Sequence, residues 1–65
     1  MKIRLLKAEF AKAGVTQKDV ANAIGVSEAT MIRKMKTGKF GTDEAEKITE
    51  FCGIEDPASI FLSSE

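Results

Sequence analysis

The side chains that could do chemistry lie together in the middle of the chain, between Thr16 and Lys39. They are hydrogen-bonding groups and cations, not the paired acids and bases of a catalytic site. A guanidinium can grip two acceptors at once, and ammonium groups attract a polyanion. The pattern therefore indicates recognition of an acceptor-rich, negatively charged partner. The polar and charged residues of this segment include Gln17, Lys18, Ser27, Glu28, Thr30, Arg33, Lys34, Lys36, Thr37 and Lys39.

Several classes of protein are disfavoured by what the composition lacks. The sequence contains no histidine and a single cysteine, Cys52, so we expect neither a zinc site nor an internal disulfide. It has no glycine-rich phosphate loop and no Ser-His-Asp arrangement. No apolar run is long enough to span a membrane, and no signal peptide is visible. We therefore expect no enzyme, cofactor, metal ion or small-molecule substrate, and the lone cysteine suits a reducing cytoplasm.

The net charge of zero hides a partition along the chain. Residues 1–40 contain nine basic and three acidic side chains, a net +6, whereas residues 41–65 contain one basic and seven acidic side chains, a net −6. Such a split is a clue to a nucleic acid or an acidic membrane on the basic side. A dipolar domain with no polyanion partner has the same pattern, so charge alone leaves both interpretations open.

Five helices are expected to position these side chains, within one compact domain covering residues 1–65. Apolar residues recur at steps of three and four with no period-two alternation, so the fold class is all-α. A chain of 65 residues can form one small core. The predicted helices cover residues 2–13, 16–24, 27–36, 42–52 and 56–62.

Capping residues mark the helix starts. Thr16 and Asp19 form a capping-box pattern, and Ser27 is placed to cap the third helix. Thr42 is expected to cap the fourth helix, ahead of an acidic first turn. Asp56, followed by a proline, marks the start of the fifth.

The core is expected to come from one face of each helix. Phe61 and Leu62 either close this core or, together with Ile60, form a contact between two copies of the chain. The predicted inward residues are Ile3, Leu6, Phe10 and Ala13 in the first helix, Val20, Ala21 and Ile24 in the second, Met31 and Met35 in the third, and Ala45, Ile48, Phe51 and Cys52 in the fourth.

A tight turn of Gly25, Val26 and Ser27 joins the second and third helices, and such a turn crosses two helices steeply. The surrounding segment, TQKDVANAIGVSEATMIRKMKTGKF, resembles the helix-turn-helix of the phage Cro and repressor-type (XRE-like) DNA-binding proteins. With five helices and a proline-started last one, the resemblance covers about residues 3–62. It implies a lambda-repressor-like fold with a central helix-turn-helix. The matching residues are Thr16, Gln17, Val20, Ala21, Ile24, Gly25, Val26, Ser27 and Met31.

The resemblance implies a sequence-specific transcriptional regulator, most like a small single-domain Cro-type repressor of a phage. Glu28, Ala29 and Arg33 match the positions that reach base edges in the major groove, with Ser27 and Thr30 beside them. The partner would be a palindromic double-stranded DNA operator, bound by a weak or DNA-induced homodimer in the cytoplasm of a bacterial host, at the nucleoid. Phosphate contacts would come from Gln17, Lys18, Lys34, Lys36, Thr37 and Lys39.

The sequence departs from the family near the end of the third helix. Lys34 stands where the family has an apolar residue, Met35 takes the core place, and Gly38 arrives one residue late. An extra residue near this helix end accounts for all three departures. The direction in which Lys36, Thr37 and Lys39 point is therefore left open. Residues 28–33 precede the extra residue, so their alignment with the family is unaffected.

Each assignment also has a purely structural interpretation. Gln17 suits an ordinary helix start, and Arg33 and Lys34 could form a solvated helix face. The alternative function is a protein-interaction module on the same helical fold, using the acidic half or the C-terminal apolar residues. Retention of duplex DNA at low salt would separate the two functions.

Overall fold

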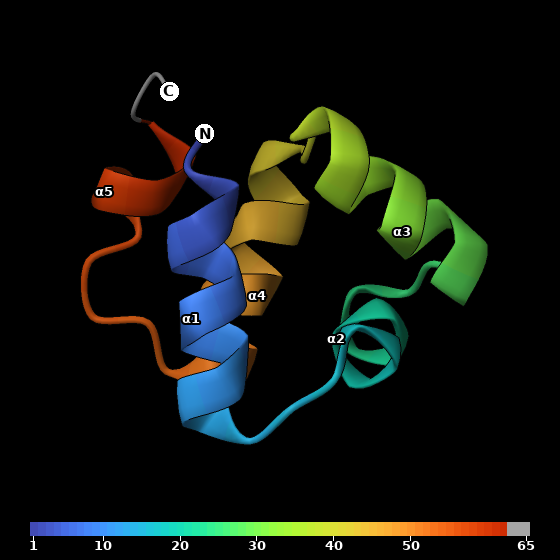
Figure 1. Cartoon of the computed structure of the whole chain (residues 1–65), viewed down its shortest axis with the longest axis horizontal. Helices are drawn as coiled ribbons and strands as arrows, with labels where there is room; N and C mark the ends of the chain where they lie inside the picture. Colours follow the sequence, from blue (N-terminus) through green and yellow to red (C-terminus); the bar gives the residue numbers. More distant parts are fainter. Residues whose placement is uncertain (63–65) are drawn as a thin grey trace.

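The computed structural model describes residues 1–62, and within that range it contains helices and no strand (Figure 1). The predicted all-α class is confirmed. The radius of gyration is 10.4 Å, close to the roughly 11 Å of a compact domain of this length. The helices are α1 (Ile3–Ala13), α2 (Gln17–Ile24), α3 (Glu28–Thr37), α4 (Thr42–Cys52) and α5 (Ala58–Phe61).

The helices pack in two connected groups. α2 lies against α3 and α4, whereas α1 lies against α4 and α5. In Figure 1, α2 is seen end-on while α3 runs across the view, so the two helices cross steeply. The start of α1 is tied to α5, because the Lys2 amide donates to the Ile60 carbonyl at 2.9 Å. The chain thus brings the start of α1 against α5, and Met1 and Ile3 also lie beside Gly38 at the end of α3.

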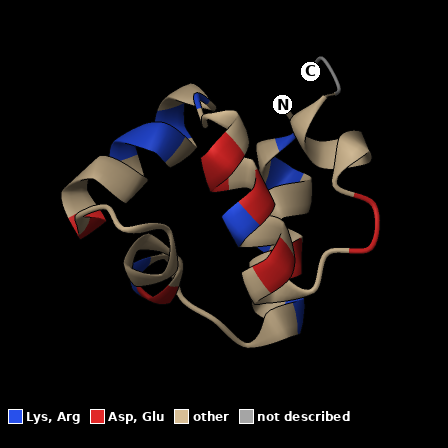
Figure 2. Ribbon diagram, turned by 180° about the vertical axis from the view of Figure 1, so that it is seen from behind, with Lys and Arg blue, Asp and Glu red and all other residues tan. Residues whose placement is uncertain are grey.

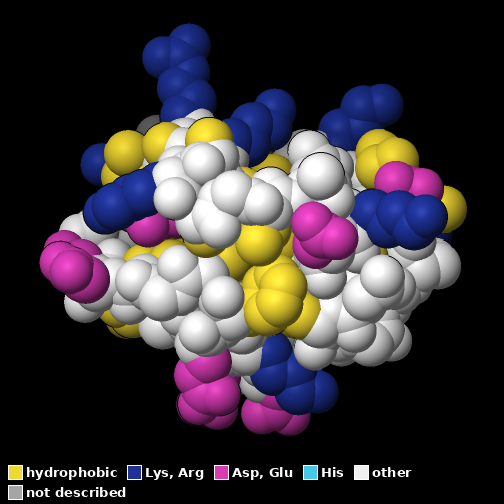
Figure 3. Space-filling view, turned by 90° about the horizontal axis from the view of Figure 1, so that it is seen from below, with side chains coloured by type: hydrophobic (Ala, Val, Ile, Leu, Met, Phe, Trp, Pro, Cys, Tyr) yellow, Lys and Arg dark blue, Asp and Glu magenta, His cyan; other side chains and the backbone are white. Residues whose placement is uncertain are grey.

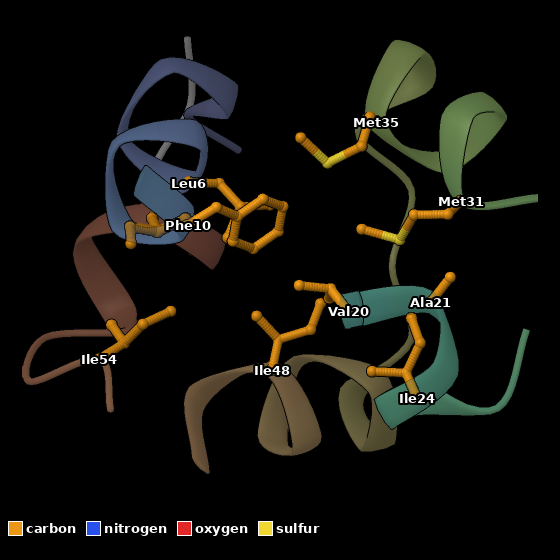
Figure 4. Close-up of a cluster of buried hydrophobic side chains, with 10 residues drawn as sticks. Leu6, Phe10, Val20, Ala21, Ile24, Met31, Met35, Ile48 and Ile54 are labelled. Carbon is orange, nitrogen blue, oxygen red and sulfur yellow. The ribbon is translucent and has the colours of Figure 1, made fainter. Parts of the chain in front are cut away.

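One hydrophobic core receives side chains from every helix (Figure 4). Most of the predicted inward residues are buried there, and Ile54 joins them from the loop after α4. In a chain this short, nearly every large apolar side chain must contribute to burial. The buried residues are Leu6, Phe10, Val20, Ala21, Ile24, Met31, Met35, Ile48, Ile54 and Ile60.

The predicted inward positions were wrong for Ala13 and Phe51, which are exposed. Beyond the end of α1, it is Val15 that packs against the core instead of Ala13. On α4 the inward direction is set by Ile48, which is fully buried, so Phe51 falls at the edge and remains 45% exposed. Cys52 is half-buried against the core, and burial, with the Glu9 carboxylate, raises the pKa of its thiol.

Of the four predicted caps, the one at Thr42 was wrong, and those at Thr16 and Ser27 are present as expected. The Thr16 hydroxyl accepts from the Asp19 amide at 3.1 Å, and an Asp19 carboxylate oxygen accepts from the Thr16 amide at 2.9 Å. The Ser27 hydroxyl accepts from the Thr30 amide at 3.1 Å. Thr42, however, is the first residue of α4. Gly41 before it has the extended backbone of a cap, and the Glu44 carboxylate in α4 accepts from the Gly41 amide.

The fifth helix is shorter than predicted, because its regular part begins at Ala58 and ends at Phe61. Asp56 still acts at its start, accepting from the Ser59 amide at 3.4 Å and from the Ser59 hydroxyl. Pro57 between them already has helical backbone angles. The predicted start signal was therefore correct in its contacts, although only one helical turn follows it.

Candidate nucleic-acid interface

The turn between α2 and α3 sets the direction of α3. Gly25 has φ +79°, in the left-handed region that a side chain disfavours. The next amide, that of Val26, donates back to the Ala21 carbonyl at 3.0 Å. Ala21 is 1% exposed, so its small side chain lies fully inside the packing of α2. These contacts end α2 abruptly at Ile24 and let α3 begin at Glu28, after a turn of three residues that ends in the cap Ser27.

α3 has two distinct faces. Met31 and Met35, one turn apart, are buried and hold the helix on the core. The opposite face is exposed to solvent along the whole length of the helix. Its residues recur at the spacing of a single helical face, which is the arrangement needed to present side chains to an extended partner. The residues of this face, called the α3 outer face below, are Glu28, Ala29, Ile32, Arg33, Lys36 and Thr37.

Ile32 is the member of this face that the sequence reasoning missed. Its side chain is 54% exposed although it lies next to the buried Met31. The spacing contained the signal, because Ile32 follows Glu28 by one helical turn and precedes Arg33 by one residue. An exposed isoleucine between charged residues offers an apolar contact, of the kind that a thymine methyl accepts.

The hydroxyl groups near the helix start and end are partly engaged within the chain. The Ser27 hydroxyl donates to the Thr30 hydroxyl at 2.9 Å while accepting from the Thr30 amide. The Thr37 hydroxyl donates to the Arg33 carbonyl at 3.1 Å. These bonds stabilise the two ends of α3. A hydroxyl whose proton is already donated can still accept from a ligand, but it must change partner to donate to one.

Lys34 is turned toward α4. Its ammonium lies 3.0 Å from Glu44 Oε1, and both side chains are largely buried, at 24% and 21% exposed. The same nitrogen is 6.0 Å from the centre of the Phe40 ring. The lysine that stands where the family has an apolar residue is thus partly buried against α4, with its charge paired to Glu44. A phosphate would have to compete with Glu44 for this ammonium.

Glu44 has a second partner at the same oxygen. Its Oε1 also accepts from the Gly41 amide at 2.9 Å, the first free donor of α4. The Gly41 amide, followed by Lys34, lowers the pKa of this carboxyl from its ordinary value. One carboxylate therefore caps α4 and holds the end of α3 against it.

The remaining predicted contact residues lie at the start of α2 and near the end of α3. Lys18, Lys36 and Lys39 are exposed, and Gln17 is half-buried at the first position of α2. Figure 2 shows basic positions along α3 and a red band at its first turn, where Glu28 begins the helix. Asp19 is close to Lys18, and its bonds with Thr16 lower the pKa of its carboxyl.

The charge partition along the sequence is only partly a partition in space. In Figure 3, several basic side chains project from the upper edge of the molecule, but others lie at the left, the right and the lower edge, where acidic side chains also project. Figure 2 shows several acidic bands on α4 and on the loop before α5. An approaching polyanion would therefore meet different potentials on different sides of the molecule.

Neither a metal site nor a membrane span is found in the part of the chain that the structure describes. Within residues 1–62, no three histidine, cysteine or acidic side chains cluster closely enough to hold a metal ion. No helix in that range is both long and apolar enough to cross a membrane. Comparison of the chain with protein-family models, curated proteins and solved structures gave no match.

Proposed function

We propose that the chain is a sequence-specific DNA-binding regulator that reads the major groove with α3. The observation that carries this proposal is the α3 outer face, a continuous exposed surface with an arginine, a lysine, a carboxylate and two apolar side chains. A helix of ten residues is about 15 Å long. Its width of roughly 10–12 Å matches the major groove, which is about 12 Å wide.

Each residue of this face has a role in the proposal. Arg33 donates to guanine O6 and N7, and Glu28 accepts from cytosine N4. Ala29 and Ile32 contact thymine methyl groups. Ser27 and Thr30 lie at the helix start, where they would meet base or sugar edges as acceptors.

Phosphate contacts would surround this base-reading surface. Lys36 and Lys39 follow the recognition helix, and Lys18 with Gln17 stands at the start of α2, where free amides favour an anion. In the proposal, Thr37 adds a hydroxyl oxygen next to Lys36, near the phosphates that follow the recognition helix. We leave Lys34 out of this set, because its ammonium already neutralises Glu44 inside the protein. Its proposed role is to fix the position of α3.

The proposal includes two copies on a palindromic operator, each held by its own contacts to one half-site. Of the three predicted dimer residues, Ile60 is buried at 3% exposed and only Phe61 and Leu62 reach the surface, so the proposal relies on the two half-sites and assigns no dimer contact to these residues. The family resemblance favours repression of transcription by a phage-type regulator in a bacterial host. Selected DNA sequences would test the symmetry directly, since a dimer yields inverted repeats about one helical turn apart.

Selection of bound duplexes from a random pool, followed by sequencing, tests the function. We expect an enriched motif, and we expect retention of random duplex at low salt that weakens as salt rises. Failure to retain any duplex at low salt would overturn the proposal and favour the alternative, a protein-interaction domain. Retention without an enriched motif would leave a DNA-binding protein that is not sequence-specific.

A further inference from the structure

The acidic side of the molecule contains a groove that the DNA-reading surface does not use. It lies between α4 and α5 and encloses about 380 Å³, a size within the range of roughly 300–1,000 Å³ typical of ligand sites. It shares no residue with the α3 outer face. Its lining residues are Thr42, Ala45, Glu46, Thr49, Glu50, Pro57, Ala58, Phe61 and Leu62.

The floor of the groove is apolar and structurally anchored. Leu62 is 83% exposed, the most exposed large apolar side chain among residues 1–62. Phe61 is half-buried and meets the edge of Phe40 with ring centres 6.5 Å apart, which holds it in place. The Thr49 hydroxyl donates to the Ala45 carbonyl at 2.8 Å, so this polar group is already satisfied within α4. An apolar ligand could therefore enter without stranding a buried donor.

The rim of the groove is acidic. Glu46 and Glu50 are exposed and stand one helical turn apart on the same side of α4. Between residues 41 and 62 the chain has six acidic side chains and one basic one, Lys47. Lys47 is not among the lining residues, and its charge acts on Glu44. The groove thus combines apolar side chains with two exposed carboxylates, Glu46 and Glu50, for which the described structure shows no ion pair.

We propose that this groove binds an amphipathic helix of another protein, with its apolar side on Phe61 and Leu62 and with lysine or arginine residues facing Glu46 and Glu50. Helices dock in apolar grooves through side chains one turn apart, and the α4 carboxylates have the same one-turn spacing. Charge complementarity selects a basic partner and raises its rate of association. Binding there leaves α3 free, so the partner and DNA can be bound together.

A second copy of this chain fits the groove less well. Symmetric pairing through the same patch would bring Glu46 and Glu50 of both copies toward each other. The chain's own basic helix, α1, offers Leu5 as its exposed large apolar side chain, at 42% exposed. One leucine on a helix that is already packed on α4 and α5 does not supply the row of apolar groups that the groove can take.

The probe for this proposal is a fluorescent synthetic helix of about 16 residues, long enough to form a helix when side-chain stapled. Leucines are placed at one-turn spacing, with lysines on both flanks. A matched peptide carries glutamates in place of the lysines. We expect the lysine peptide to bind at least about tenfold more tightly than the glutamate peptide, with the difference shrinking as salt rises. Amide chemical-shift changes should concentrate at Ala45, Thr49, Ala58 and Leu62.

Two pairs of variants of the full chain localise the binding. Leu62→Ser should weaken the lysine peptide about fivefold or more, whereas Leu5→Ser, the same exchange on α1, should leave it unchanged. Glu50→Lys should weaken it about tenfold, whereas Glu55→Lys, outside the groove, should change it less than twofold. All four side chains are exposed, so circular dichroism should show a retained fold.

Several outcomes would overturn the proposal. These are equal binding of the two peptides, shift changes centred on α3, or Leu5→Ser weakening the peptide as much as Leu62→Ser. The occupant would instead be a second copy of this chain under two conditions: the protein self-associates in a way that Leu62→Ser abolishes, and the lysine peptide does not compete with that self-association. Retention of random duplex at low salt by Leu62→Ser is measured alongside, because it reports on DNA binding independently of the groove.

Discussion

Arg33 is the side chain of the α3 outer face best suited to choose between base pairs. Its exposed guanidinium has a planar fork that matches two acceptors on guanine, whereas an ammonium acts as a point charge. Lys34, the next residue, is directed to Glu44 and Phe40 instead. Two adjacent cations in the sequence therefore serve different purposes, because one helical step separates the exposed face from the packed one.

Replacing Arg33 by alanine should cost about 1–3 kcal/mol at one base pair of the selected motif and relax the preference there. Binding of matched duplexes that differ at single positions measures this cost. Arg33→Lys is the control, because it keeps the charge and loses the fork, so it should lose base preference while retaining affinity for random duplex. A uniform weakening on all sequences by Arg33→Ala would assign the residue to a phosphate.

At the scale of helices, the junctions are built by local rules that repeat along the chain. Three helices end in a glycine with positive φ followed by a valine or isoleucine whose amide donates five residues back. At the α2–α3 junction this ending decides where α3 points. The amide of Val26 could not reach the Ala21 carbonyl if residue 25 took an ordinary helical or extended conformation.

Gly25→Ala should destabilise the fold by roughly 1–2 kcal/mol, because an L side chain is strained at this φ. The surroundings are not the cause, since a Cβ there would meet nothing within 4 Å. Gly41→Ala is the comparison: Gly41 has φ −72°, which any residue adopts, so the cost should be smaller and limited to what alanine loses to glycine as a helix cap. Urea unfolding of both variants measures the two free energies. Equal losses would show that the left-handed backbone is not the source of the effect.

The contact between α3 and α4 should make stability depend on pH. The pKa of Glu44 is lowered in the folded chain from its ordinary value of 4.5. The stabilisation is therefore fully present above that value and is lost as the pH falls below it, through the lowered pKa. Glu44→Gln should be less stable than the wild type at pH 7 and should lose less stability on acidification.

Thermal unfolding at several pH values between 7 and about 3 measures this dependence. Glu46→Gln is the control, since it removes the same charge from an exposed position of α4 and leaves the Gly41 and Lys34 contacts intact. Parallel pH profiles for Glu44→Gln and the wild type would show that the α3–α4 contact is not what the acid disrupts.

At the scale of the whole molecule, the two halves of the chain carry opposite charge and offer different surfaces. The basic half contains α1, α2 and α3, and the acidic half contains α4 and α5. A polyanion is attracted to the first and repelled by the second, which orients the molecule as it approaches. The proposed groove uses the second half for a partner of the opposite sign.

Replacing Lys36 or Lys39 by alanine should weaken binding to all duplexes similarly and reduce the salt slope by about one unit each. Each lysine is exposed near the end of α3, where it would neutralise one phosphate. Lys12→Ala, at the end of α1, is the control and should leave the slope unchanged. Affinities measured over a series of salt concentrations give the slope. A loss confined to particular sequences would place these lysines at base edges instead.

The sequence by itself determined the helices and most of their ends. Capping by Thr16 and Ser27, and the stops at the glycines, depend on residues within a few positions of one another, so local patterns were enough. The buried faces of α2 and α3 also followed from spacing, and Met35 lies in the core as the shifted pattern predicted. The capping error at Thr42 arose because the cap lies one residue earlier, at Gly41, which has no side chain, and the Glu44 carboxylate accepts from the Gly41 amide.

Only the tertiary structure decided which marginal side chains face solvent and which face another helix. Ile32 and Phe51 are apolar yet exposed, because the directions of α3 and α4 are set by the residues that pack most deeply, Met31 and Ile48. Lys34 is polar yet largely buried, because a carboxylate ten positions away lies beside it once α3 and α4 meet. The groove between α4 and α5 likewise depends on how these two helices pack, because its lining residues come from both. Such features depend on distances between segments that no local pattern encodes.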